Sequence, residues 1–181
     1  MKIFLKSVAF SGDIILLDEE AAKVIKENDA FIVPTLAIYD AFYHHGKEYN
    51  TPDHVLEKLN DVRESGINAI RIAHKYGVNI GFGTDLLGGL MKYQNTEFNI
   101  RSEVETPFQT LYSACYKNAE LLNMTDKLGI IKEEAFADIL VFEENPLENI
   151  GVLTSPEKNI KLIIKDGNLV LNRINDYTIE D

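Results

Sequence analysis

The sequence predicts an α/β fold in which helices pack around a parallel sheet, followed by a short β tail. Short apolar runs alternate with longer segments of helical periodicity up to Leu128, and this alternation is typical of parallel sheets. After Gly129, strand-like runs and a tight-turn dipeptide replace that pattern. The 181 residues suffice for one sizeable core, but are fewer than the ~250 of a complete (β/α)8 barrel.

The first predicted elements are a helix and a buried strand. The apolar run at residues 13–17 leads into the acidic residues 18–20, which favour the first turn of a helix because negative charge is stabilised there. Residues 30–38 are rich in Phe, Ile and Val and predict a buried strand interrupted by Pro34. The polar and aromatic residues 39–50 predict a loop.

The clearest predicted helix begins at Thr51 and Pro52, with Thr as the N-cap and Pro at the first helical position. Apolar residues then recur at spacings of three and four, which places them on one helix face. They are Val55, Leu59, Val62, Gly66, Ile70 and Ala73. Gly77 is expected to end this helix, and residues 78–82 predict a short strand that leads directly to Asp85.

A later helix is expected to start at Thr106, which has capping-box spacing to Gln109. Its predicted buried stripe comprises Phe108, Leu111, Tyr112, Cys115, Ala119 and Leu122. The β tail follows, with strands expected at residues 138–142 and 160–164. Asp166-Gly167 is a strong signal for a hairpin turn.

Composition excludes several classes of protein. The formal net charge of -11, from 29 acidic and 18 basic residues, argues against binding to nucleic acid. The single cysteine, Cys115, excludes an internal disulfide and a Cys-rich zinc site, and its place on an apolar stripe predicts a core residue. No stretch reaches the ~20 apolar residues of a membrane span. Residues 1–5 lack the features of a secretory signal, so the expected location is the cytoplasm.

Asp85 is the main candidate for chemistry, because it directly follows a predicted strand within a glycine-rich loop. Loops at the carboxyl ends of strands converge on one mouth in βα proteins. A carboxylate there can bind a metal or accept a proton from metal-bound water. The structural alternative is that Asp85 caps the next helix or orders the turn.

Two histidines, His44 and His45, fall in the predicted loop that would open onto the same mouth. With Asp85 they could in principle bind zinc, although adjacent residues rarely face one ion, and ordinary surface histidines are the alternative. His54 and His74 lie within the long predicted helix and are expected to be surface or packing residues.

Candidates for the rim of a substrate pocket are Tyr39, Glu97 and Arg101. Glu97, Arg101 and Glu103 form a charged group after the glycine-rich loop. They could contact a polar substrate, or they could form a solvated helix face.

A family resemblance connects these segments. Residues 78–89, Val-Asn-Ile-Gly-Phe-Gly-Thr-Asp-Leu-Leu-Gly-Gly, resemble the eighth barrel strand and following loop of the amidohydrolase superfamily, in particular its imidazolonepropionase-like and prolidase-like (Xaa-Pro dipeptidase-like) members. Residues 18–36 resemble the passage from the sixth helix to the seventh strand. Residues 129–167 resemble the return to the small β-sandwich. The likeness extends from about Ser7 to Asn172.

The resemblance implies a partial TIM-type (β/α)8 barrel, made of its last strands and helices, with a C-terminal piece of the small β-sandwich. It places barrel elements at residues 1–128, the β-sandwich segment at 129–174 and a tail at 175–181. Family members hydrolyse amide, ester or related bonds with one or two divalent metals, usually zinc.

The family's metal ligands have one counterpart in this sequence. Asp85 matches the aspartate that ends strand eight, which implies that it is a metal ligand and a general base. The ligands of strands one to five would precede the first residue. The sixth-strand histidine would fall at residues 9–12, which are Ala-Phe-Ser-Gly.

Three hypotheses follow. The chain is the C-terminal fragment of a metal-dependent amidohydrolase, incomplete or inactive alone, whose other barrel half comes from a second polypeptide or is replaced by self-association; an active form would take a small-molecule substrate. Alternatively, it is a non-catalytic scaffold or binding protein that retains the fold remnant. The third hypothesis is a small independent hydrolase with a new site built from His44, His45 and Asp85.

Overall fold

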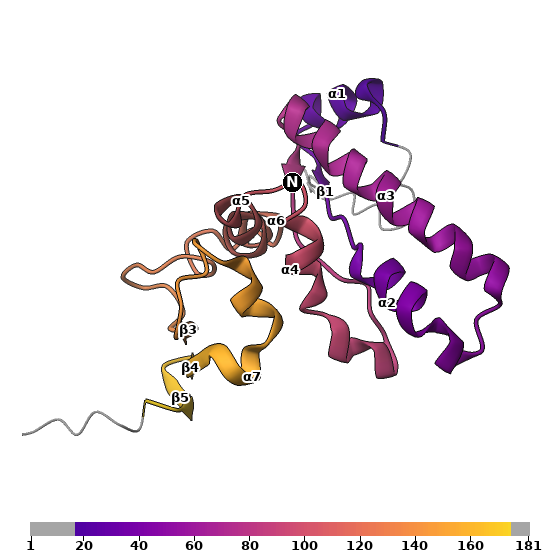
Figure 1. Cartoon of the computed structure of the whole chain (residues 1–181). Helices are drawn as coiled ribbons and strands as arrows, with labels where there is room; N and C mark the ends of the chain where they lie inside the picture. The colour runs from indigo at the N-terminus through magenta and orange to yellow at the C-terminus, as the bar shows by residue number, and fades with distance from the viewer. Residues whose placement is uncertain (1–16, 175–181) are drawn as a thin grey trace, which may run out of the picture.

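The computed structural model describes residues 17–174 (Figure 1). The predicted run at residues 13–16, the position of the sixth-strand histidine and the tail at 175–181 lie outside the described residues. In the first half the elements are α1 (Glu19–Glu27), β1 (Phe31–Ile32), α2 (Ala37–His45), the 3₁₀-helix η2 (Gly46–Tyr49), α3 (Asp53–Tyr76) and β2 (Asn79–Ile80).

Strands β1 and β2 pair in parallel, as the alternation of elements predicts. Phe31 lies opposite Asn79 and Ile32 opposite Ile80. The main core forms between these strands and helices α1, α2 and α3. Its buried apolar side chains are Ala22, Ile32, Leu36, Ala37, Ala41, Ile67, Ala69, Ile70, Ala73, Val78, Ile80, Leu86, Leu90 and Ile100.

The helix α3 confirms the predicted helix, with one shift at its start. Of its predicted apolar face, the second half is buried (Gly66, Ile70 and Ala73), whereas Val55, Leu59 and Val62 are only partly buried. Pro52 has extended backbone angles (φ -62°, ψ 144°) and is the N-cap, so Thr51 lies outside the helix. Gly77 ends α3 in the left-handed conformation at φ 65°, which glycine adopts without strain.

The predicted strand at residues 30–38 is much shorter in the structure, and the predicted loop at 39–50 is wrong. Pairing covers only β1, because Pro34 has no N–H to donate to a ladder. The helix α2 begins at Ala37 and buries Ala37 and Ala41. Its N-cap residue, Leu36, makes no side-chain cap hydrogen bond, so the sequence carries no local start signal.

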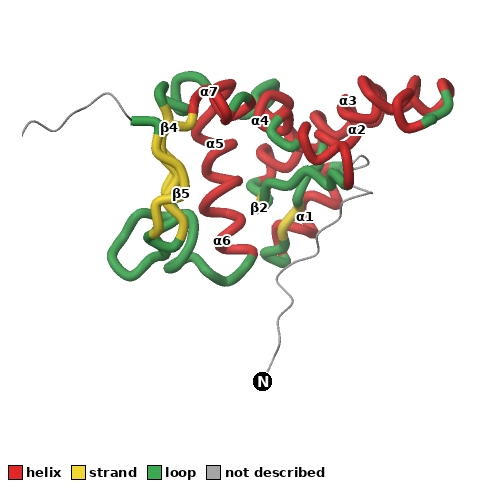
Figure 2. The backbone as a smooth tube through the Cα atoms, turned by 90° about the horizontal axis from the view of Figure 1, so that it is seen from below, coloured by secondary structure: helices red, strands yellow, loops and turns green. Residues whose placement is uncertain are grey.

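In the second half the elements are η3 (Gly88–Tyr93), α4 (Thr96–Arg101), α5 (Pro107–Tyr112), the π-helical turn η4 (Ser113–Lys117), α6 (Asn118–Leu121), β3 (Ile139–Phe142), η5 (Ile150–Thr154), α7 (Pro156–Asn159), β4 (Ile160–Lys165) and β5 (Asn168–Asn172). The capping box predicted at Thr106 and Gln109 is present. Elements α5 to α6 form a continuous helical rod that stands between the antiparallel sheet and the first half of the chain (Figure 2).

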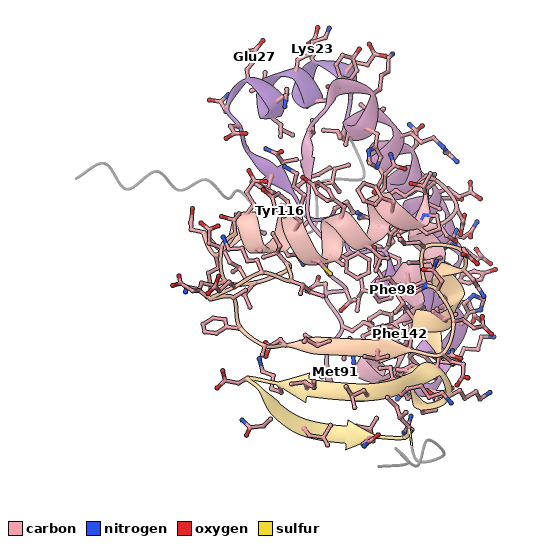
Figure 3. All side chains as sticks on the ribbon, turned by 90° about the vertical axis from the view of Figure 1, so that its left-hand side faces the viewer. Lys23, Glu27, Met91, Phe98, Tyr116 and Phe142 are labelled. Atoms are coloured by element: carbon pink, nitrogen blue, oxygen red, sulfur yellow. The ribbon has the colours of Figure 1, made fainter. Side chains whose placement is uncertain are left out.

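The antiparallel sheet has the strand order β3-β4-β5. The turn between β4 and β5 confirms the predicted hairpin: Asp166 and Gly167 have φ values of 49° and 75°, as a two-residue type I′ turn requires. A second, smaller core packs Phe98, Leu111 and Phe142 against η5. Figure 3 shows Phe98 and Phe142 close together, linking α4 to β3.

The predicted buried stripe of the rod is largely wrong. Phe108 and Leu122 are 62% and 61% exposed, and Tyr112 is 39% exposed. Cys115 is exposed rather than a core residue. The rod instead turns small side chains inward, namely Thr110, Ser113 and Ala119, because small residues allow close approach to β2. Across the part of the chain that is described, no helix has both the length and the apolar character needed to cross a membrane.

Candidate active site

The candidate site lies where β1 and β2 end, because both strands run in the same direction and their following loops leave from one edge. The backbone N–H of Gly81 donates to Ile32 O at 2.8 Å, which extends the pairing beyond β2. The two segments that follow β1 and β2 then remain in close contact. A Cβ at Gly83 would lie 2.9 Å from Val33 Cγ1 and 3.2 Å from Thr35 Cγ2, so a glycine is needed for this approach.

Two side chains fix the backbone that leads from β2 to Asp85. Asn118 on α6 accepts from Phe82 N at 2.9 Å and donates to Phe82 O at 2.9 Å, so one amide side chain satisfies both backbone groups of Phe82. Arg101 on α4 donates from Nη2 to Gly81 O at 3.3 Å. The loop carrying Asp85 therefore starts from a base that is bonded to two helices.

Asp85 itself is exposed and has a left-handed backbone, with φ 52°. This conformation is uncommon for a residue with a side chain and is often found at functional sites. The next residue, Leu86, is only 7% exposed and belongs to the main core. Because Leu86 is held inside, the strained backbone presents the carboxylate of Asp85 outward at the strand edge.

The two candidate histidines point in different directions from α2. The His45 ring stacks on Tyr93 of η3, with centroids 4.1 Å apart, and its Nδ1 lies 3.3 Å from Glu48 Oε1. His44 lies 3.8 Å from Asp40 and lines an open cavity of about 670 Å³ between α2 and α3. Tyr39, the remaining candidate on α2, packs against the main core.

Glu97 and Arg101 are placed inside the protein, each 0% exposed. The solvated helix face considered for this segment is therefore wrong for both residues, and neither lies on a surface rim. Glu97 Oε2 accepts from Ala37 N at 2.6 Å and thus bonds the start of α2. Only Glu103 of the predicted charged group has a partly exposed side chain, paired with Arg63.

A buried ion-pair network extends from Arg101. Arg101 Nε donates to Glu105 Oε2 at 2.9 Å, and His74 Nε2 lies 2.7 Å from Glu105 Oε1. Thr110 Oγ1 also donates to Glu105, at 3.1 Å. Burial raises the pKa of Glu105, but the hydrogen bond from His74 and the charge of Arg101 outweigh burial and lower it overall.

Sequence reasoning missed Glu105, Asn118 and Thr35 as residues of this region. A signal existed for the first, because Glu97, Arg101 and Glu105 recur every four residues, the spacing that brings side chains together on a helix, although α4 ends at Arg101 and Glu105 follows it. Nothing local in the sequence marks Asn118, whose partner is a backbone 36 residues away.

A zinc site needs three or four protein ligands around one ion. Within residues 17–174, no three His, Cys, Asp or Glu side chains lie together so that they could hold a metal. The structure thus does not bring His44, His45 and Asp85 together. Asp85 offers one oxygen ligand, and the described residues alone do not fit a complete metal centre.

Parallel strands joined by helices, with a carboxylate at the carboxyl edge, define a segment of a barrel-type α/β enzyme scaffold. The chain belongs to the amidohydrolase family, whose model matches residues 9–170. Among curated proteins, ochratoxinase of Aspergillus niger is 30% identical over 154 residues, which cover 84% of this chain and 32% of that protein.

Solved structures agree with this assignment. A crystal structure of an amidohydrolase is 42% identical and has a TM-score of 0.82 over 87% of this chain. A prolidase complexed with N-methylphosphonate-L-proline is 41% identical with a TM-score of 0.81, and a Xaa-Pro dipeptidase with bound methionine is 30% identical with a TM-score of 0.72. The chain spans 38% of each of these three structures. The predicted fold class, a partial barrel, is confirmed.

Proposed function

We propose that this chain is the C-terminal portion of a metal-dependent amidohydrolase that cleaves carbon–nitrogen bonds, with Asp85 as its catalytic carboxylate. The observation that carries the proposal is the exposed Asp85, in a left-handed backbone conformation, at the exit of a parallel strand. Family membership supports the reaction class. The fixed base of the loop, bonded by Asn118 and Arg101, supports a preorganised position for the carboxylate.

In this proposal Asp85 accepts a proton from the attacking water and transfers it to the leaving nitrogen. It is also one ligand of a divalent metal, with zinc as the first candidate. The remaining ligands are assigned to a second polypeptide that supplies the other half of the barrel. Such a partner would pair with the strand edges and cover the apolar rod α5–α6.

The first substrate class to test is Xaa-Pro dipeptides. This choice rests on the prolidase and the Xaa-Pro dipeptidase that resemble the chain at 41% and 30% identity. A small-molecule amide of this kind has a scissile carbonyl and a nitrogen leaving group, which match the proton transfers assigned to Asp85.

A non-catalytic scaffold or binding role is the second candidate. It is favoured by the sequence Ala-Phe-Ser-Gly at residues 9–12, where the family resemblance places a metal-binding histidine. In that case the fold would persist without metal binding, and Asp85 would serve only to order its loop.

Fragment complementation tests the two roles. The 181-residue chain is purified alone and mixed with the preceding segment of the 42%-identical amidohydrolase. Zinc content after dialysis and hydrolysis of Xaa-Pro dipeptides are then measured. We expect the mixture to hold zinc and cleave dipeptides, and Asp85→Asn to abolish cleavage. Asp53→Asn, at an exposed position of α3, is the matched control.

The decisive contrary result is a mixture that forms a stable complex by sedimentation but holds no zinc and cleaves nothing. This outcome would exclude the hydrolase and favour the scaffold. If the chain binds zinc without a partner and loses it when both His44 and His45 are replaced, the result would instead support the hypothesis of an independent hydrolase site.

A further inference from the structure

Glu97 is a carboxyl group inside the protein that makes no ion pair within the described residues. Its side chain is 0% exposed. Oε2 accepts one hydrogen bond, from Ala37 N at 2.6 Å, while Oε1 has no hydrogen-bond partner in the described part of the chain. Arg101 lies one turn further along α4, but its ion pair is with Glu105.

A buried carboxylate that makes no ion pair is strongly disfavoured, and such groups normally bind a proton instead. Burial raises the pKa of Glu97 to about 8. The charge of Arg101 and the backbone N–H groups of Ala37 and Leu36 act in the opposite direction, and the charge of Glu105 adds to the effect of burial. At neutral pH the side chain is therefore mainly a carboxylic acid.

The position of Glu97 gives this acid a structural task. Helix α2 has no cap of its own at Leu36, and Glu97 supplies the missing acceptor from α4, 60 residues away. Arg101 on the same helix donates to Gly81 O at the end of β2. One helix, α4, thus bonds both the start of α2, through Glu97, and the end of β2, through Arg101.

We infer that Glu97 is a positioning residue that works as a neutral carboxylic acid, holding the start of α2 against α4. The inference is independent of the proposed catalytic function. It requires only that the acceptor oxygen be present and that the side chain carry no charge.

The groups facing Glu97 are few. From α4 and the residues just after it, Arg101 and Glu105 face Glu97, and Glu105 is bonded to His74 of α3. On α2 the backbone N–H groups face it. The nearest ionisable side chains in sequence are Tyr39, which packs against the main core, and Asp40, which is paired with Arg63. The 3₁₀-helix η5, which packs against α4, contains no ionisable residue over Ile150–Thr154.

The test compares Glu97→Gln, Glu97→Leu and wild type by thermal unfolding between pH 4 and pH 9, with Glu57→Gln as the control at an exposed position. Gln keeps the acceptor and cannot ionise. The folded-state pKa of Glu97 lies above the unfolded value of 4.5. Its contribution to the free energy of unfolding is therefore fully present below pH 4.5 and is lost as the pH rises to about 8.

We therefore expect the melting temperature of Glu97→Gln, relative to wild type, to rise steadily over that window and to level off above it. Glu97→Leu removes the acceptor. It should accelerate hydrogen exchange of the Ala37 amide by at least tenfold, and Gln should restore protection. Glu57→Gln should show neither effect.

The opposite pattern would overturn the inference. If Glu97 acts as a charged carboxylate, Glu97→Gln will be less stable than wild type at pH 7 and the difference will not grow toward pH 8. If Glu97 does not position α2, Leu and Gln will give the same exchange rate at Ala37.

Discussion

Buried ionisable side chains on α4 and just after its end set the chemistry of this region. Glu97 and Glu105 sit on either side of Arg101, yet their pKa values move in opposite directions: that of Glu97 rises to about 8 and that of Glu105 falls. The two pKa values move in opposite directions because the two carboxyl groups have different hydrogen-bond and ion-pair partners. Glu105 bonds to both Arg101 and His74, whereas Glu97 bonds only to backbone N–H groups at the start of α2.

At this scale the Arg101–Glu105 pair leads to a prediction. Glu105→Gln leaves the buried Arg101 without its anion and should lower the free energy of unfolding by about 3 kcal/mol at pH 7. Because the folded-state pKa of Glu105 lies below 4.5, its contribution is present above that value and is lost as the pH falls through the folded-state pKa. The difference in the free energy of unfolding between wild type and Glu105→Gln should therefore become smaller at acidic pH, as measured by urea unfolding at several pH values.

The neighbouring Glu103 provides the comparison for that experiment. Its side chain is 45% exposed and pairs with Arg63, so Glu103→Gln should change the free energy of unfolding by less than about 1 kcal/mol. Equal effects of the two substitutions would mean that burial of the Arg101–Glu105 pair does not matter.

At the scale of elements, local signals account for what was predicted. The long helix α3, the capping box of α5 and the β4–β5 hairpin are each specified by residues close together in the sequence. All three are present, with the start of α3 shifted by one residue. Helix α2 was missed because its cap comes from Glu97, 60 residues away. Asp85 could be found by its place after a strand, but the burial of Glu97 and Arg101 depends on packing between distant elements.

The contact between α6 and the end of β2 gives a prediction for an element. Asn118→Ala removes both hydrogen bonds to the backbone of Phe82 and should lower the free energy of unfolding by about 2 kcal/mol, since two partly buried groups lose their partners. Hydrogen exchange should speed up at Phe82 N–H. Asn118→Asp retains an acceptor for that N–H and should protect it better than Ala does; identical exchange in the two variants would show that Asn118 does not hold this backbone.

At the scale of the whole molecule, exposed apolar surface favours association between copies of the chain, whereas the net charge opposes it. Along the rod α5–α6, Phe108, Tyr112 and Tyr116 form a stack with ring centroids 5.7 Å and 5.0 Å apart, and Leu122 is 61% exposed. Exposed apolar surface of this kind favours association. The net charge of -11 makes two copies repel each other.

This balance predicts that the isolated chain of 20.5 kDa self-associates more strongly as salt increases. The Debye length falls from ~30 Å at 0.01 M to ~3 Å at 1 M salt, which removes the repulsion but leaves the apolar attraction. Sedimentation equilibrium at several salt concentrations should show a rising average mass. Phe108→Ser with Leu122→Ser should suppress the rise, whereas Val24→Ser, an exposed position on α1, should not. An average mass that stays monomeric at every salt concentration would mean that the rod does not drive association between copies.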